Sequence, residues 1–319
     1  MDLRQLSYVV AVVDHDGFTA AATALHVAQP SLSQAIKALE TELGVALFDR
    51  VGRKVRLTAA GRALLPAARQ ALRDIDIARE AVDAVRGVEG GRLDLVSIPT
   101  LGVSPVAEFI GAFRAAHPAV TVRLVEPDEA GAVAAHVMGG QSEIGFTELP
   151  LPTPGPTAHA TRAERATRSD RGPAPAADRL TSVELASQEY VAVHHRSVER
   201  GALVSLPQLA ELPLVTTTPG TSTRRLIDEA FRQAGCSPRI AIESDLREVI
   251  AAIVEAGGGY SILPRTVGER MAARGLGAVR VAEIVPTISR RIGLIHRPGT
   301  LSPAARAFLD LVRRSLPPD

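Results

Sequence analysis

The chain has 319 residues, a length that predicts two or three compact units rather than one. Its 36 Lys and Arg residues are balanced by 35 Asp and Glu residues, so a globally basic coat for nucleic acid is excluded and any site for a polyanion must be local. A hydrophobic content of 46% argues against wholesale disorder, and the single cysteine, Cys236, excludes an intrachain disulfide and a cysteine-cluster metal site.

The first residues do not resemble an export signal. The start MDLRQLSYVVAVVDHD carries acidic residues inside its apolar run, and no window approaches the roughly 18 uninterrupted apolar residues of a membrane span. We therefore expect a soluble protein of the reducing cytoplasm that has no membrane partner.

Residues 1–57 predict three short helices followed by a hairpin. Their apolar residues recur at steps of three and four, as on one face of a helix: Leu3, Leu6, Val9, Val10 and Val13; then Ala21, Ala22 and Leu25; then Leu32, Ile36, Leu39 and Leu43. Pro30 and Ser31 open the third helix and Gly44 closes it. Two short alternating runs around Gly52 indicate a hairpin over residues 45–57.

A long helix follows. Thr58 is in position to cap it, and its apolar stripe runs from Gly61 to Val85 before Gly87 or Gly90-Gly91 ends it. Pro66 lies inside this stretch, so its first turns are either kinked or a separate short helix. A small domain cannot bury so long a stripe, and a partner helix from a second chain is the simplest cover.

From Arg92 onward, strands alternate with helices, which predicts an α/β unit with a mostly parallel sheet. The predicted strands are residues 92–99, 120–126, 143–148, 189–195, 213–218, 239–244, 260–264 and 290–298, and the predicted helices are 106–118, 128–140, 222–235, 246–257 and 303–316. Residues 150–178 lose this periodicity and indicate a surface insertion or flexible loop.

The dense pattern over residues 2–65 resembles the winged helix-turn-helix of the LysR-type transcriptional regulators. The residues that carry it are Ala21-Ala22, Gln29-Pro30, Ser33, Leu39-Glu40, Leu43-Gly44, Leu47-Phe48, Arg50, Leu57-Thr58 and Gly61. The segments EIGF and GGGYSILP are also similar to that family, so the resemblance covers essentially the whole chain, weakly at 150–180.

The resemblance implies a division of the chain into three parts. Residues 1–57 would be the DNA-binding domain, 58–90 a dimerising linker helix, and 91–319 a two-lobed effector domain of the periplasmic-binding-protein kind, with lobe I at 91–165 and 266–319 and lobe II at 166–265. It also implies a homodimer through the linker helix, usually a homotetramer, on double-stranded promoter DNA. RNA polymerase is a candidate partner, and no cofactor or metal is expected.

The third predicted helix carries the candidate base-reading residues. Ser33, Gln34 and Lys37 lie opposite its apolar face, and with Gln29 and Ser31 near its start they suit base edges and phosphates in the major groove. The alternatives are ordinary solvated residues and, for Ser31 with Gln34, a capping box. LysR-type regulators often carry arginine just after the serine that corresponds to Ser33, whereas this chain has Gln34.

The predicted hairpin adds a local positive cluster without acids. Arg50, Arg53 and Lys54, with Arg56 close by, suit phosphate or minor-groove contact, although a solvated hairpin would look the same.

Two hydroxyl-rich segments in the effector domain are candidate ligand sites. Ser97, Thr100 and Leu101 follow the first strand, and Thr218 and Ser222 precede a helix in TTTPGTSTRR. Ligands gather at the carboxyl ends of parallel strands, and hydroxyls beside free helix N–H groups favour anions. The resemblance places the two segments across the cleft between the lobes, so a small anionic effector is expected. Such residues also commonly serve only as helix caps.

The function predicted from the sequence is an effector-responsive transcriptional regulator rather than an enzyme. No G-x-S-x-G, P-loop, H-E-x-x-H or dinucleotide fingerprint is present, and only Cys236 or the pair Glu243/Asp245 would be left for catalysis. A plain solute-binding protein of the same fold, or a regulator with a vestigial effector pocket, are the remaining alternatives.

Overall fold

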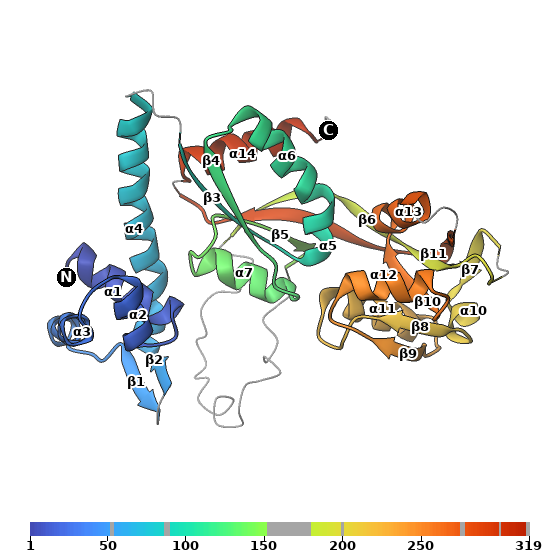
Figure 1. Cartoon of the computed structure of the whole chain (residues 1–319), viewed down its shortest axis with the longest axis horizontal. Coiled ribbons are helices and arrows are strands. Elements are labelled where there is room, and N and C mark those ends of the chain that lie inside the picture. The colour runs from blue at the N-terminus through green and yellow to red at the C-terminus, as the bar shows by residue number, and fades with distance from the viewer. Residues whose placement is uncertain are drawn as a thin grey trace.

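The computed structural model describes residues 1–51, 54–85, 90–151, 180–198, 201–274, 278–299 and 301–316. It contains a helical head, one long helix and a two-lobed α/β domain, so the predicted fold class is confirmed (Figure 1). Residues 150–178, for which we expected a surface loop, fall almost entirely outside the described residues.

The head contains α1 (Leu3–Asp14), α2 (Phe18–Ala24), α3 (Gln29–Leu43) and the antiparallel strands β1 (Phe48–Val51) and β2 (Lys54–Leu57). The predicted apolar faces meet in one core, where Val9, Leu32 and Leu39 are fully buried. Gly44 ends α3 in the left-handed conformation, at a φ of 68°, as a glycine after a helix commonly does.

The linker is the single helix α4 (Ala59–Val85) of 27 residues. Thr58 caps it as predicted, because the Thr58 hydroxyl accepts a hydrogen bond from the Gly61 amide at 3.0 Å and donates one to the Ala46 carbonyl at 2.7 Å. Pro66 lies inside an uninterrupted helix, so the alternative of a separate short helix is wrong. Val82, in the apolar stripe near the far end, is 61% exposed and is therefore not covered by this chain.

The two lobes share one sheet. Lobe I contains β3 (Gly91–Ser97), β4 (Val120–Val125) and β5 (Ile144–Leu149) with α5 (Pro99–Leu101), the π-helix η1 (Gly102–Val106), α6 (Ala107–Ala116), α7 (Ala130–Met138) and α14 (Pro303–Arg314). Lobe II contains β7 (Leu203–Ser205), β8 (Pro213–Thr216), β9 (Arg239–Glu243) and β10 (Tyr260–Pro264) with α10 (Leu206–Ala210), α11 (Ser222–Gln233), α12 (Arg247–Glu255) and α13 (Arg265–Arg274).

Two long antiparallel strands, β6 (Thr181–His195) and β11 (Val279–His296), connect the lobes. The strand order is β4-β3-β5-β11-β6-β10-β8-β9, with β7 beside β11. The outer pairs are parallel as predicted, whereas β6 and β11 are antiparallel to each other. The sequence pattern had shown only one end of each long strand, residues 189–195 of β6 and 290–296 of β11.

The chain crosses from lobe II back to lobe I at a later point than residue 266, where we expected the boundary. Met271 of α13 and Val279 of β11 pack in a lobe II core with Val191 and Val193. The chain therefore returns to lobe I only within β11, where Ile292 and Leu294 join the lobe I core. Lobe II was also expected to begin at 166, but the first half of β6, with Leu185, packs in lobe I.

Among the described helices, none combines the length and apolar character needed to cross a bilayer.

Candidate functional site

Helix α3 presents a polar ridge on the surface of the head. Its buried face, with Leu32 and Ile36, packs in the head core, whereas Gln34 and Lys37 are exposed and Ser33 is half-buried. Ser31 is also exposed, and Gln29, the first residue of the helix, is half-buried. The five predicted residues therefore share the N-terminal half of one exposed helix.

The capping box proposed for Ser31 and Gln34 is wrong. Helix α3 begins two residues earlier, at Gln29, with Ala28 at the capping position and Pro30 in the first turn. Ser31 is consequently inside the helix, where its backbone amide donates to the Ala28 carbonyl at 3.0 Å. Because Gln34 has no capping role and is exposed, its amide is available to an outside partner.

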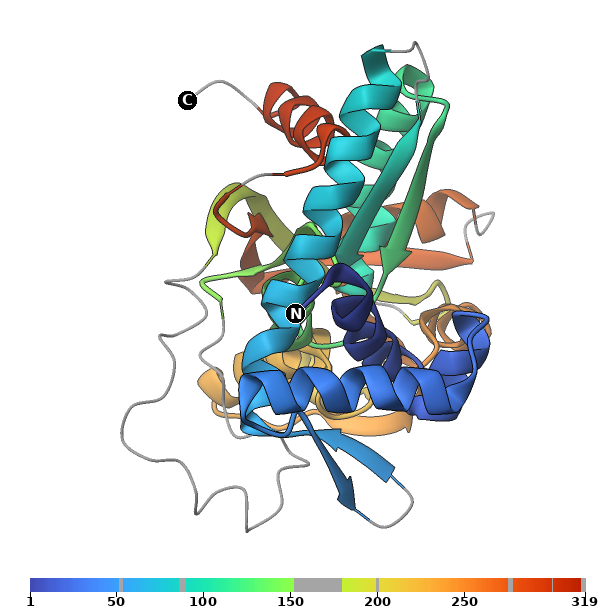
Figure 2. The same ribbon diagram turned by 90° about the vertical axis from the view of Figure 1, so that its left-hand side faces the viewer.

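The hairpin is attached rigidly to the head. The carboxylate of Glu40 on α3 accepts from the backbone amides of Leu47 at 2.7 Å and Phe48 at 3.2 Å. The ring of Phe48 meets that of Phe18 edge-on, with centroids 5.6 Å apart. The hairpin thus projects from the head as a fixed wing beside α3 (Figure 2).

Two of the cationic residues of the wing, Arg50 and Lys54, lie in its strands. Arg50 pairs in register with Val55, and Lys54 with Val51. Arg53 lies outside the described residues, between β1 and β2.

In lobe I, the three predicted effector residues have different environments. Ser97 is fully buried and donates to the neighbouring Ile98 carbonyl at 2.9 Å, and Leu101 is fully buried in the lobe I core. Of the three residues, only Thr100 makes a side-chain contact with a distant segment, because its hydroxyl accepts a hydrogen bond from Arg290.

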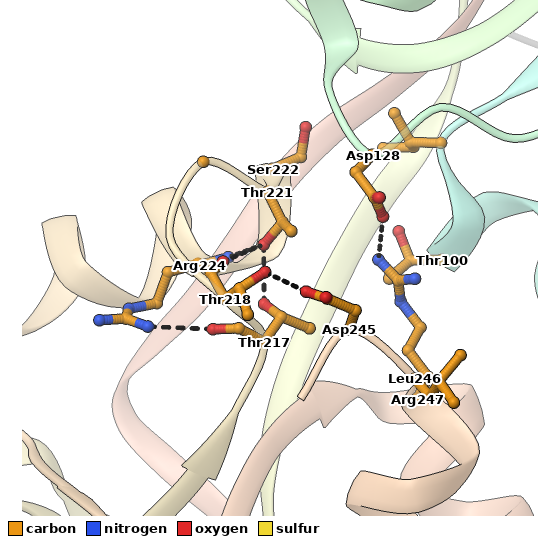
Figure 3. Close-up of polar contacts among 12 residues, drawn as sticks. Thr100, Asp128, Thr217, Thr218, Thr221, Ser222, Arg224, Asp245, Leu246 and Arg247 are labelled. Carbon is orange, nitrogen blue, oxygen red and sulfur yellow. Dashed lines mark hydrogen bonds and ion pairs between the residues drawn. The ribbon is translucent and has the colours of Figure 1, made fainter. Parts of the chain in front are cut away.

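In lobe II, the segment before α11 forms a compact hydroxyl cluster (Figure 3). Thr221 caps α11 by accepting from the Arg224 amide at 3.1 Å, and its hydroxyl lies 2.7 Å from that of Thr217. Thr218 donates to the Asp245 carboxylate. Within this cluster, Thr221 serves as a helix cap, which is the alternative role considered above for these hydroxyl residues.

Ser222 bridges the lobes directly. Its amide donates to the Asp128 carbonyl at 3.1 Å, and its hydroxyl accepts from the Ala130 amide at 3.2 Å. Arg247 of α12 reaches the Asp128 carboxylate at 3.3 Å, so a third bond crosses between the lobes at the same point (Figure 3). The segment before α11 therefore meets lobe I through Ser222, at the start of α7 and not at the predicted segment that contains Thr100.

Sequence reasoning missed the buried Arg290 at the junction of the lobes. Arg290 is 7% exposed and donates to the Gln188 side-chain oxygen at 2.9 Å and to Glu148 at 3.2 Å, besides Thr100. Its guanidinium lies 5.4 Å from the centre of the Tyr190 ring. Glu148 also approaches Arg225 of lobe II at 3.6 Å, so one carboxylate lies between two arginines from different elements.

Strand alternation was the signal that could have found Arg290. In the run RRIGLIHRP, Arg290 shares its face with the buried Ile292, whereas Arg291 points outward and pairs with Glu184 at 2.9 Å.

Burial raises the pKa of Tyr190, although the nearby Arg290 opposes that shift. Within the described residues, no group of three or more His, Cys, Asp or Glu side chains could hold a metal ion.

A winged head on a long helix, joined to a two-lobed α/β domain with a polar inter-lobe cleft, defines an effector-linked DNA-binding protein. The helix-turn-helix model of the bacterial regulatory lysR family matches residues 3–62, and the LysR substrate binding domain model matches residues 170–317. The chain belongs to the LysR family of DNA-binding transcriptional regulators, whose members here are named as regulators and not as enzymes.

Curated relatives and solved structures agree over the whole length. The chain is 30% identical to the SDS degradation transcriptional activation protein of a Pseudomonas species, over 98% of this chain and 95% of that protein. It is 29% identical to the regulator IlvR of Caulobacter vibrioides, over 98% and 97%. Full-length CbnR in complex with its target DNA is 28% identical, with a TM-score of 0.62 over 99% and 100% of the two chains.

A full-length OxyR variant from Pseudomonas aeruginosa has a TM-score of 0.71 at 22% identity, which shows a shared fold.

Proposed function

We propose that this regulator reads promoter DNA with Gln29, Ser31, Ser33, Gln34 and Lys37 of α3 and grips phosphates with Arg50, Arg53 and Lys54 of the wing. The observation that carries this proposal is the exposed polar half of α3 beside a wing fixed by Glu40. Side chains at the start of a recognition helix reach base edges, and cations of a wing neutralise phosphates. CbnR, a relative of this chain, has been solved with its target DNA.

We further propose that two copies pair through α4, and that dimers associate into a tetramer. The exposed Val82 in the stripe of α4 supports pairing, because an apolar helix face that its own chain leaves open is stabilised by a second copy. Light scattering of the purified protein tests the assembly. A monomer at micromolar concentration would contradict it.

For the effector we propose a small carboxylate bound between the lobes, at Thr100, Ser222 and Thr218. The support is the convergence of hydroxyls with two arginines: buried Arg290, which already holds Thr100, and Arg225, both of which approach Glu148. A ligand carboxylate at this point would replace Glu148 between the guanidinium groups, since planar guanidinium groups pair well with carboxylates. Ser97 and Leu101, both fully buried next to Thr100 in the chain, would support the site only through packing.

Matched pairs of ligands test this effector class. Small aliphatic and aromatic carboxylic acids are compared with their methyl esters in a thermal-shift screen of the full chain. Binding to the folded state raises the unfolding temperature by mass action, so an acid should stabilise and its ester should not. Equal stabilisation by an acid and its ester contradicts an anionic effector. No stabiliser at all would favour the vestigial pocket.

The DNA part is tested separately with the duplex upstream of this gene. Fluorescence anisotropy at two salt concentrations should show binding that weakens steeply as salt rises. Absence of binding at low salt, with a folded protein, would contradict the proposal for the head.

A further inference from the structure

Helix α7 lies between the inter-lobe cleft and the linker helix. It runs Ala130–Met138, nine residues or about 14 Å at 1.5 Å per residue. In Figure 1 it lies across the middle of the molecule, with α4 toward one end and lobe II toward the other. The contacts at its two ends come from different parts of the protein.

The N-terminal end of α7 is capped by the other lobe. Its own capping residue, Glu129, makes no side-chain capping bond. Ser222 takes that role instead, because its hydroxyl accepts from the Ala130 amide, one of the free N–H groups of the first turn. The Ser222 amide and Arg247 hold Asp128 just before the helix.

The C-terminal end of α7 is held by the linker helix. The Gly139 carbonyl accepts from Arg69 at 3.3 Å, and the Gly140 carbonyl accepts from Arg73. Cations at a helix C-terminus are stabilised by the free carbonyls and the helix dipole. A Cβ on Gly140 would lie 2.5 Å from the Arg73 guanidinium, so the glycine allows this close approach.

One of these arginines, Arg69, also reaches the DNA-binding head. Arg69 is 6% exposed and also pairs with Asp14 at the end of α1, so one side chain joins the head, the linker and lobe I. Burial, followed by repulsion from Arg297, lowers the pKa of Arg73 to about 10. A cavity of about 560 Å³ opens beside this contact, lined by Val13 of α1, Leu72 of α4 and Arg123 of lobe I.

We propose that α7 couples the cleft to the linker helix, with Ser222 holding one end and Arg69 and Arg73 the other. An effector that takes over Ser222 removes the cap of α7 and thereby weakens the hold of α4 on lobe I. This inference rests on the proposed function, because it uses the inter-lobe cleft as the effector site. Because such coupling is reciprocal, loss of the Arg69 and Arg73 contacts at one end of α7 weakens the Ser222 contact at the other end by the same factor.

The experiment measures the distance between the head and lobe I without any effector. Spin labels are attached through Ala24→Cys on α2 and Ala115→Cys on α6, both exposed positions, in a Cys236→Ser background. Labelled chains are mixed with excess unlabelled chain, so that each assembly holds one labelled copy, and the distance distribution is recorded by pulsed electron paramagnetic resonance.

Arg73→Ala should broaden or shift the head-to-lobe distance distribution, and Ser222→Ala should do the same from the opposite end of α7. Arg247→Ala, which breaks the bond to Asp128, is a second cleft variant in case Ser222→Ala does not fold. Arg79→Ala, exposed on α4, and Ser237→Ala, exposed on lobe II, are matched controls and should leave the distribution unchanged.

If Arg73→Ala changes the distribution and neither cleft variant does, the coupling through α7 is refuted while the arginine contact stands. If Arg73→Ala has no effect, the contact itself is refuted. Because no ligand is added, these outcomes are independent of whether a carboxylate binds, so failure of the coupling and failure of the proposed effector are distinguishable.

Discussion

The DNA-binding head and the inter-lobe cleft are built in opposite ways. The head takes all its core from residues close in sequence, and three consecutive helices bring their apolar faces together. The junction of the lobes brings together Thr100, Glu148, Gln188 and Arg290 from four distant segments. Changes in the head should therefore act on local packing and DNA, whereas changes in the cleft should act on two lobes at once.

The largest expected effect is at the cleft. Arg290→Ala removes a buried cation, leaves Gln188 without its partner and leaves Glu148 with Arg225 alone, which should destabilise the effector domain by about 3 kcal/mol. Arg291→Ala, one residue on, breaks only an exposed pair with Glu184 and should cost much less stability than Arg290→Ala. Urea unfolding of both variants measures the difference. Equal losses of stability in the two variants would contradict a larger contribution from the buried Arg290.

The next effect is at the junction of the head and linker. A Cβ at Gly61 would lie 2.2 Å from the Leu47 carbonyl oxygen, so Gly61→Ala should destabilise by about 2 kcal/mol through overpacking. Gly111 on α6 has nothing within 4 Å of such a Cβ, and Gly111→Ala should stabilise by about 0.5 kcal/mol or more, since alanine is the better helix former. Thermal unfolding of the two variants shows whether each gains or loses stability. Changes in the same direction would contradict this difference in packing.

A third effect separates the two parts of the DNA interface. Arg53→Ala should weaken binding to all duplexes several-fold and lower the salt slope by about one, because one phosphate contact is lost. Gln34→Ala should instead change which bases are preferred. Anisotropy titrations against the upstream duplex and point variants of it measure both. Arg239→Ala and Gln233→Ala, exposed in lobe II, are the controls.

An unchanged salt slope for Arg53→Ala would remove the wing from the DNA contacts, and unchanged base preference for Gln34→Ala would leave Gln34 as a solvated residue.

The smallest effect concerns pH at α7. Burial, with repulsion from Arg69 and Arg123, lowers the pKa of His136 below its ordinary value of 6.5. The unfolded chain then binds the proton more readily, so stability is complete above pH 6.5 and falls as the pH drops below it. Urea unfolding between pH 7.5 and 5.5 should show a smaller loss for His136→Asn than for wild type. The control His26→Asn, at an exposed position, should match wild type.

If the stability of His136→Asn depends on pH as strongly as that of wild type, His136 has the same pKa in the folded and the unfolded chain.

The sequence by itself predicted most of the head, because helix periodicity, Thr58 and Gly44 act through neighbours a few residues away. It also predicted the fold class. It misjudged the start of α3, since Pro30 fits an early helical position as well as the turn before it.

Only the tertiary structure decided how the lobes are joined and what each cleft residue does. The full length of β6 and β11 is set by their pairing with each other across the sheet, and the partners of the buried Arg290 come from other segments of the chain. Ser222 caps a helix of the other lobe, and Arg73 holds the far end of that helix from the linker. Such contacts join residues far apart in the chain, and no local pattern encodes which partner a hydroxyl or a guanidinium meets.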